Sequence, residues 1–210
     1  MNYRRLFFTG IVCILIAFIV ISWIKKPEIK NINSKGSDII AFGDSLVYGT
    51  GASQRGETDM FSLVSKNLGV EIINKGVPGD TTVDGLERLE NDVLSQDPKI
   101  VFILLGGNDY LQKIPKEQTF QNLKLIVKKI QEKGAIVILM GIRGGLLDHF
   151  ENEFEKLAKE YNTGYIPDVL EGIILNRDLM ADSVHPNDKG YRIISIRVFS
   201  VLEQILELTQ

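Results

Sequence analysis

From Asp38 to the end of the chain, short apolar runs alternate with longer stretches whose apolar residues recur every three or four positions. Short apolar runs are typical of buried strands, and the longer pattern is typical of amphipathic helices. The expected strands are Asp38–Phe42, Val70–Asn74, Ile100–Leu105, Ala135–Gly141 and Gly164–Ile166, and the expected helices are 59–68, 82–95, 117–133, 147–161 and 188–208. This alternation predicts an α/β fold.

The run 101–105 is apolar at every position, as expected for a strand buried on both faces of a sheet. Such strands, separated by helices, predict a three-layer fold in which helices cover both faces of a parallel sheet of about five strands. Ligands bind sheets of this kind at the carboxyl ends of the strands. We therefore expect the functional residues in the loops that follow the strands.

The N-terminus has a different character. Leu6–Ile24 is a run of nineteen residues without a charge, and as a helix it would span roughly 28 Å, close to the hydrocarbon thickness of a bilayer. Residues 1–24 are therefore expected to form a transmembrane anchor. The alternatives are a cleaved signal segment and a buried core helix. The run is longer than the apolar region of most signal peptides and does not end in small residues.

Residues 25–36 are polar and are expected to form a linker, which leaves 37–210 as one folded domain. We expect this domain to lie outside the cytoplasm, at the membrane surface or secreted if the segment is cleaved. Residues 1–30 carry a net charge of +4, so the remainder holds 19 basic and 26 acidic side chains, a net charge of −7. An acidic domain repels phosphate backbones, so nucleic-acid binding is not expected.

The residue inventory also limits the cofactors. Cys13 is the single cysteine, so neither an internal disulfide nor a cysteine-based zinc site can form. A metal site built from Asp182, His185 and Asp188 would lack a second histidine. The run Gly49–Gly51 lacks the Gly-Lys-Ser/Thr ending of a phosphate-binding loop. We therefore expect neither a metal nor a cofactor.

Four loops at the expected carboxyl edge carry polar residues suited to catalysis. They read Gly-Asp-Ser-Leu at 43–46, Asn-Lys-Gly-Val-Pro-Gly-Asp-Thr at 74–81, Gly-Gly-Asn-Asp at 106–109 and Asp-Ser-Val-His-Pro-Asn at 182–187. Taken alone, each could be only a turn or a helix cap. Together they supply a serine, an Asp–His pair and candidate oxyanion donors, which are the components of acyl transfer.

In order and spacing, these four segments resemble the conserved blocks of the GDSL/SGNH hydrolases, particularly the small lysophospholipase L1-like and arylesterase-like members. The resemblance covers about 170 residues, and the chain lacks the Gly-x-Ser-x-Gly elbow of ordinary α/β-hydrolases. It implies a flavodoxin-like sheet and hydrolysis of small-molecule esters or thioesters. It further implies that Ser45 is the nucleophile, that Asp182 and His185 are its partners, and that Ser45, Gly79 and Asn108 form the oxyanion hole.

Elementary chemistry favours the same roles. A serine hydroxyl needs a base within hydrogen-bond reach, and the chain has two histidines, of which His149 lies in a charged helix start typical of a solvated surface. His185 precedes a proline, which favours an extended backbone, and Asn187 can then cap the last helix. Asp182 can turn back to orient the imidazole of His185.

Other interpretations stay open at this point. The domain could be a carbohydrate O-acetylesterase or an acyltransferase that uses the same triad, or an inactive binding module. Asp44 and Asp109 are expected to shape their loops rather than to react. The apolar residues of the site loops could line an acyl groove, and the Gly144–Gly145 pair would make the fourth loop pliable; the apolar residues are Tyr110, Leu111, Ile114, Leu146 and Leu147.

Overall fold

The computed structural model describes residues 28–143 and 150–209. The expected anchor at 1–24 lies outside these residues, as do His149, the Gly144–Gly145 pair, Leu146 and Leu147. Among the helices of the described ranges, none combines the length and the apolar character needed to cross a membrane.

A five-stranded parallel sheet forms the centre of the domain, in the order β2-β1-β3-β4-β5. This is the strand order of flavodoxin-like folds. The strands are β1 (Asp38–Gly43), β2 (Ile73–Gly76), β3 (Pro98–Leu104), β4 (Ile136–Met140) and β5 (Gly164–Ile166). The structure thus confirms the α/β class and the five-stranded parallel sheet.

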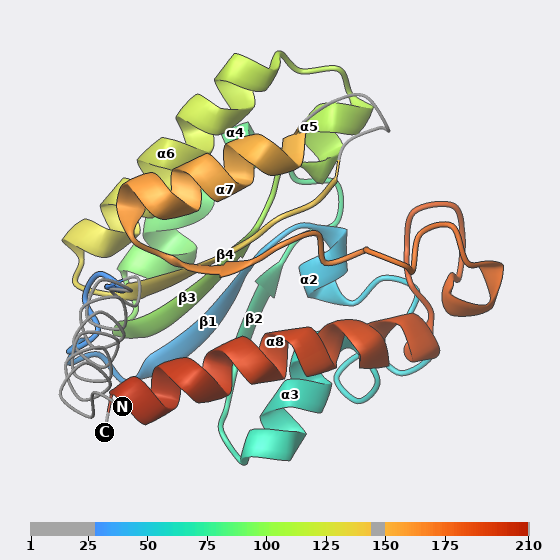
Figure 1. Ribbon diagram of the computed structural model, residues 1–210, viewed down its shortest axis with the longest axis horizontal. Coiled ribbons are helices and arrows are strands. Elements are labelled where there is room, and N and C mark those ends of the chain that lie inside the picture. Colours follow the sequence, from blue (N-terminus) through green and yellow to red (C-terminus); the bar gives the residue numbers. More distant parts are fainter. Residues whose placement is uncertain (1–27, 144–149, 210) are drawn as a thin grey trace, which may run out of the picture.

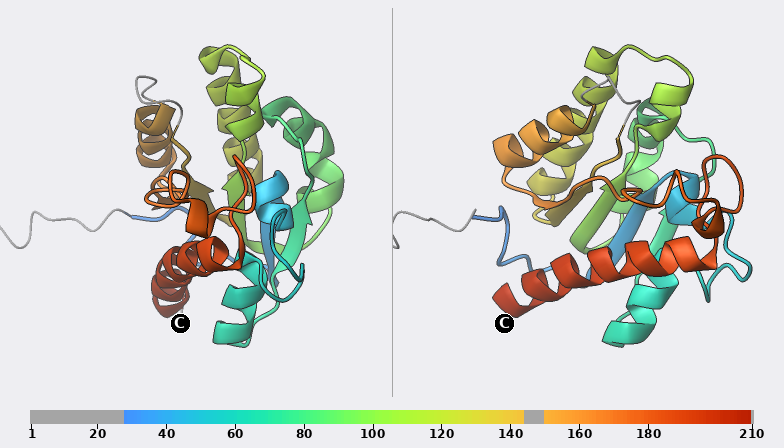
Figure 2. Two further views of the ribbon diagram at one scale, coloured as in Figure 1. Left: turned by 90° about the vertical axis from the view of Figure 1, so that its right-hand side faces the viewer. Right: turned by 45° about the vertical axis from the view of Figure 1, so that its right-hand side comes forward.

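Helices cover both faces of this sheet and give the three expected layers (Figures 1 and 2). On one face, α3 packs against α8, and on the other face α6 packs against both α4 and α7. The helices are α2 (Ser45–Tyr48), α3 (Met60–Leu68), α4 (Thr82–Leu89), α5 (Gly107–Leu111), α6 (Lys116–Glu132), α7 (Phe150–Tyr161) and α8 (Asp188–Leu208), with a π-helix η1 (Glu90–Leu94) and a 3-10 helix η2 (Arg177–Leu179).

The core lies between the layers and includes the central strands. All residues of β4, and the stretch 100–104 of β3, are buried. Between α6 and α7, the rings of Phe120, Phe150 and Phe154 pack edge to face or tilted, with centroids 5.0 to 6.2 Å apart. This aromatic cluster fixes the start of α7, which lies next to the carboxyl edge of the sheet.

Two predicted elements are wrong in extent. The strand expected at Val70–Asn74 begins only at Ile73, because the hydroxyl of Ser65 donates to the carbonyl of Val70 (2.6 Å) and holds the preceding segment against the end of α3. Val70 packs against the core from this turn, which explains its apolar character. The helix expected at 82–95 changes from α to π geometry after Leu89. The short helices α2, α5 and η2 were not predicted.

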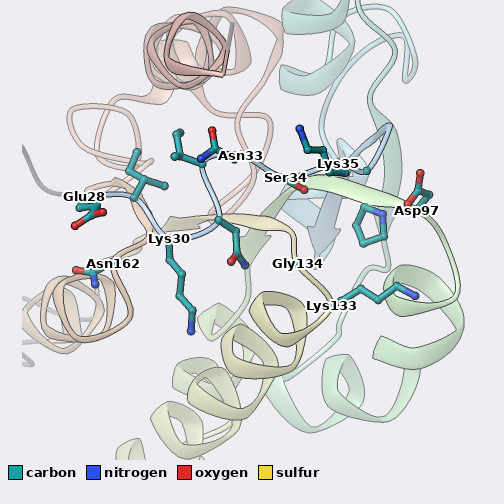
Figure 3. A pocket seen from close by; sticks show the side chains of 14 residues that line it. Glu28, Lys30, Asn33, Ser34, Lys35, Asp97, Lys133, Gly134 and Asn162 are labelled. Carbon is teal, nitrogen blue, oxygen red and sulfur yellow. The ribbon is translucent and has the colours of Figure 1, made fainter.

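Residues 28–36 pack against the amino edge of the sheet, the edge opposite the expected site. The amide nitrogen of Asn31 donates to the carbonyls of Gln131 (2.8 Å) and Ala135 (2.9 Å), and the backbone N–H of Lys30 donates to the carbonyl of Asn162 (2.8 Å). This segment lines a polar cavity of about 710 Å³ together with Asp97 (Figure 3). The described chain therefore starts at the amino edge.

Candidate functional site

A cavity of about 460 Å³ opens at the carboxyl edge of the sheet, within the usual size range of small-molecule sites. Its lining brings together Ser45, Gly79, Asn108 and His185, which the sequence places in four separate loops. The fold thus gathers the candidate residues, except that Asp182 stands behind His185 and lines an adjoining depression.

Ser45 is held at the first position of a one-turn helix. Asp44, directly after β1, is the N-cap of α2, and its carboxylate accepts the backbone N–H of Leu46 (2.9 Å). Gly49 takes the left-handed conformation, with a φ of 91°, and ends the helix. The one-turn helix that carries the serine is therefore fixed at its N-terminus by Asp44 and at its C-terminus by Gly49.

His185 links Ser45 to Asp182. The Nε2 atom of His185 lies 3.0 Å from Oγ of Ser45, and its Nδ1 atom lies 2.8 Å from Oδ2 of Asp182. The other oxygen of Asp182 accepts the backbone N–H groups of Val184 and His185, both at 2.8 Å. Oriented in this way, the imidazole can donate from Nδ1 and keep Nε2 free to accept a proton from the serine.

The Asp182 carboxylate is stabilised in its charged form. The N–H of Val184, followed by the side chain of His185, lowers its pKa to about 2. Asp182 is therefore ionised throughout the neutral range and can support a positive charge on His185.

The loop that carries His185 is fixed by Asn187. As predicted, Asn187 caps the last helix, with its side-chain oxygen accepting the N–H groups of Lys189 and Gly190. Its amide nitrogen donates to the carbonyls of Asp178 and Met180. One side chain thus joins the histidine loop to both flanking segments.

Gly79 and Asn108 reach the cavity from neighbouring loops. Gly79 has a φ of 91°, and a Cβ atom there would meet no heavy atom within 4 Å, so backbone conformation rather than lack of space requires glycine. Asn108 lies in the first turn of α5, and its amide nitrogen donates to the carbonyl of Asp80 (2.8 Å). This bond fixes the amide and uses one of its two N–H groups.

Asp109 joins two of the site loops. Its carboxylate is fully buried and accepts the N–H (2.9 Å) and the hydroxyl (2.5 Å) of Thr82, together with the hydroxyl of Thr119 (3.2 Å). The start of α4 is thereby held against α5 and α6. These contacts agree with the expected loop-shaping role of Asp109.

Asp188 is held by the segment that follows α2. Its carboxylate accepts the N–H and hydroxyl of Ser53 and the hydroxyl of Thr58. Across residues 28–143 and 150–209, no group of three His, Cys, Asp or Glu side chains is placed to hold a metal ion.

The rest of the cavity lining is mostly apolar. Tyr110 and Leu111 line it as the sequence suggested, whereas Ile114 does not. Sequence reasoning missed the other apolar residues, which are Leu46, Pro78, Ile142, Phe150, Leu170, Ile174 and Val184. Most of these lie in helices or in the long segment after β5, where an apolar side chain is indistinguishable from an ordinary core residue.

Comparison with known proteins gives a consistent result. A sequence profile described as the GDSL-like lipase/acylhydrolase family matches residues 41–193. Esterase TesA of Pseudomonas aeruginosa is 30% identical over 160 residues, which cover 70% of this chain and 79% of TesA. An arylesterase of Vibrio mimicus is 33% identical over 136 residues, covering 61% and 68%. A crystal structure of TesA is similar with a TM-score of 0.75 at 27% identity, covering 80% of this chain and 99% of that one.

The burial of Asp44 predicts that the stability of the domain depends on pH. Burial raises the pKa of its carboxyl to about 7, although the N–H of Leu46 and the nearby His185 oppose the shift. Because the folded state prefers the protonated acid, the contribution of Asp44 to stability is full below about pH 4 and is lost as the pH rises to about 7. Asp44→Asn keeps a capping oxygen without the charge. We expect its free energy of unfolding, relative to wild type, to rise across this range by up to a few kcal/mol.

Urea unfolding at several pH values between 4 and 8 measures this difference. Asp182→Asn serves as the control, since the pKa of Asp182 is lowered and its contribution is lost only as the pH falls toward about 2. A difference between Asp44→Asn and wild type that does not change with pH would contradict the burial argument.

Proposed function

This chain belongs to the GDSL-like lipase/acylhydrolase family, and from that premise we propose that it is a serine hydrolase that cleaves carboxylic esters or thioesters through an acyl-enzyme. The observation that carries the proposal is the hydrogen-bonded chain from Ser45 through His185 to Asp182, at the wall of an apolar cavity.

In the proposed reaction, Oγ of Ser45 attacks the acyl carbon while Nε2 of His185 takes the hydroxyl proton. Asp182 stabilises the resulting imidazolium through Nδ1. Collapse of the tetrahedral intermediate breaks the bond to the leaving group, which receives the proton from His185. Water then attacks the acyl-enzyme with His185 again as the base, which releases the acid and restores the serine.

The negative oxygen of the tetrahedral intermediate requires donors. We propose the backbone N–H groups of Ser45 and Gly79 and the side-chain amide of Asn108, which border the same cavity as the nucleophile. Donors that are already fixed before the reaction stabilise this charge without reorganising. The contact of Asn108 with the Asp80 carbonyl is one source of that fixation.

The cavity lining supports an acyl group longer than acetyl. Aliphatic and aromatic side chains such as Ile142, Phe150 and Leu170 offer no partners for the hydroxyls of a sugar, whose burial without hydrogen bonds would be costly. The lining therefore favours an acyl ester or thioester over an acetylated carbohydrate. Assays with p-nitrophenyl esters of graded length, an acyl-CoA and an acetylated sugar compare these substrates directly, and a clear preference for the acetylated sugar would reverse this choice.

We further propose that Leu6–Ile24 anchors the enzyme in a membrane, with the catalytic domain outside the cytoplasm. The described chain starts at the amino edge, and β3 separates that edge from the site by seven residues, or about 20 Å at the usual rise of a strand. A cavity at the far edge suits a substrate that reaches the enzyme from solution.

The first prediction of the proposed function concerns the triad. Ser45→Ala and His185→Ala should each lower the turnover of a p-nitrophenyl ester by several orders of magnitude, and the double variant should be little worse because the two residues act as a unit. A fluorophosphonate probe should label wild type at Ser45 and leave Ser45→Ala unlabelled. Unaltered turnover in either single variant, or labelling of another serine, would exclude the mechanism.

The second prediction concerns Asn108. Asn108→Ala removes one proposed donor and should lower kcat by roughly 100- to 1000-fold. KM should change little, because the donor acts on charge that develops only in the transition state. Asn108→Asp should be at least as damaging, since a carboxylate would repel the oxyanion. Steady-state kinetics on folded protein test this, and a wild-type kcat in Asn108→Ala would remove Asn108 from the oxyanion hole.

The third prediction concerns the anchor. The full chain should sediment with membranes and resist extraction by alkaline carbonate. Leu15→Arg puts a charge in the middle of the apolar run, at a cost of about 3 kcal/mol on insertion scales, and should release a larger share of the protein. Release of the wild-type chain by carbonate would rule out an integral anchor.

A further inference from the structure

Arg88 makes an unusually large set of contacts close to the site. It lies in the last turn of α4, and only 17% of its side chain is exposed. Its guanidinium donates to two carboxylates, from Nε to Asp80 (2.5 Å) and from Nη1 to Asp92 (2.7 Å). It also donates to two backbone carbonyls, from Nη1 to Lys75 (3.0 Å) and from Nη2 to Gly43 (2.8 Å). It also lies over the ring of Phe42, 4.2 Å from the centroid.

One of these contacts fixes the end of β1. Gly43 is the last residue of that strand and stands two positions before Ser45. The Gly43 carbonyl accepts Nη2 of Arg88 and also the N–H of Val77 from the loop after β2. Arg88 thus helps to set where the chain leaves the sheet toward the serine and its N–H group.

A second contact fixes the loop after β2. Asp80 follows Gly79 directly, is buried, and pairs with Nε of Arg88. The backbone carbonyl of the same Asp80 accepts the amide of Asn108 (2.8 Å). By fixing Asp80, Arg88 therefore also fixes the positions of the Gly79 N–H and the Asn108 side chain.

Resting on the proposed function, we propose that Arg88 is the positioning residue of the oxyanion hole. Each of the three donors, Ser45, Gly79 and Asn108, is within two residues or one hydrogen bond of a group that Arg88 holds. Arg88 touches none of the reacting atoms and acts through Gly43 and Asp80.

Fixing both the Gly43 carbonyl and the Asp80 carboxylate requires an arginine at position 88. The planar guanidinium donates in several fixed directions at once and stacks on an aromatic ring, whereas the ammonium group of lysine is a single point on a flexible stem. Lysine could pair with Asp80 or with the Gly43 carbonyl, but it could not fix both in one geometry. A displacement of about 1 Å in such a site can cost roughly 100-fold in rate.

Two carboxylates give a matched comparison. Asp80 and Asp92 both pair with Arg88, but only Asp80 leads on to the proposed donors. Asp80→Ala should lower kcat by roughly 10-fold or more, whereas Asp92→Ala should keep kcat near that of wild type. Arg88→Lys should lower kcat by roughly 10- to 100-fold with KM within about twofold.

A trifluoromethyl ketone separates positioning from a merely structural role. It adds to the serine and places a negative oxygen in the oxyanion hole, so its affinity should fall in Arg88→Lys in parallel with kcat. Arg197→Lys is the structural control, because Arg197 also donates to backbone carbonyls, those of Val169 and Glu171, in the segment after β5. It should lower stability without changing kcat or the affinity for the ketone.

The outcomes separate this inference from the proposed function. If Asn108→Ala lowers kcat but folded Arg88→Lys does not, the proposed oxyanion hole is supported and the positioning role of Arg88 is overturned. A loss in Arg88→Lys confined to KM, or equal effects of Asp80→Ala and Asp92→Ala, would also overturn it. If Arg88→Lys does not fold, the two aspartate variants decide. If wild type shows no Ser45-dependent hydrolysis, the proposed function itself fails.

Discussion

The position at which β1 ends, in register with the ends of β2 and β3, determines how the loops of the site are arranged. Gly43, its last residue, pairs with Gly76 at the end of β2 and with Leu104 at the end of β3. Because these three parallel strands end together, the loops behind them start side by side, and Ser45, Gly79 and Asn108 border one cavity. The close packing leaves no room for side chains here: a Cβ on Gly43 would lie 2.3 Å from the Leu104 carbonyl oxygen. Glycine at this position is therefore required by the sheet itself.

Convergence of the loops also brings three buried acids, Asp44, Asp80 and Asp109, to one edge. A buried carboxylate is costly unless it is paired, hydrogen-bonded or neutralised. The structure uses all three solutions: Asp80 pairs with Arg88, Asp109 accepts hydrogen bonds from Thr82 and Thr119, and burial raises the pKa of Asp44 to about 7. The contacts of Asp80 and Asp109 also tie a site loop to its neighbour, so for these two residues the groups that compensate the charge also position the site.

The sequence predicted what is local and periodic. Strand–helix alternation was enough for the class of fold, and loop residues such as Ser45 and His185 were visible because reactive side chains stand out next to turns. Arg88 was not visible, since an arginine four residues before Asp92 in an amphipathic helix is equally typical of a solvated surface. The error at Val70 has a similar origin, because an apolar residue packed from a turn has the same pattern as one in a strand. What sequence reasoning missed depends on contacts between distant segments.

The hydrogen bond between Ser45 and His185 is the clearest case of such a contact, because the two residues lie near opposite ends of the domain's sequence. The turn after α2 packs tightly on the histidine loop: a Cβ on Gly51 would lie 2.4 Å from the Pro186 carbonyl oxygen. In the first turn of α8, the hydroxyl of Tyr191 donates to the carbonyl of Thr50 (2.6 Å). Farther along, α8 packs against α3. Contacts of the last helix and of the histidine loop with the turn after α2 thus hold His185 next to Ser45, so the hydrogen bond between the two side chains depends on packing between segments 140 residues apart.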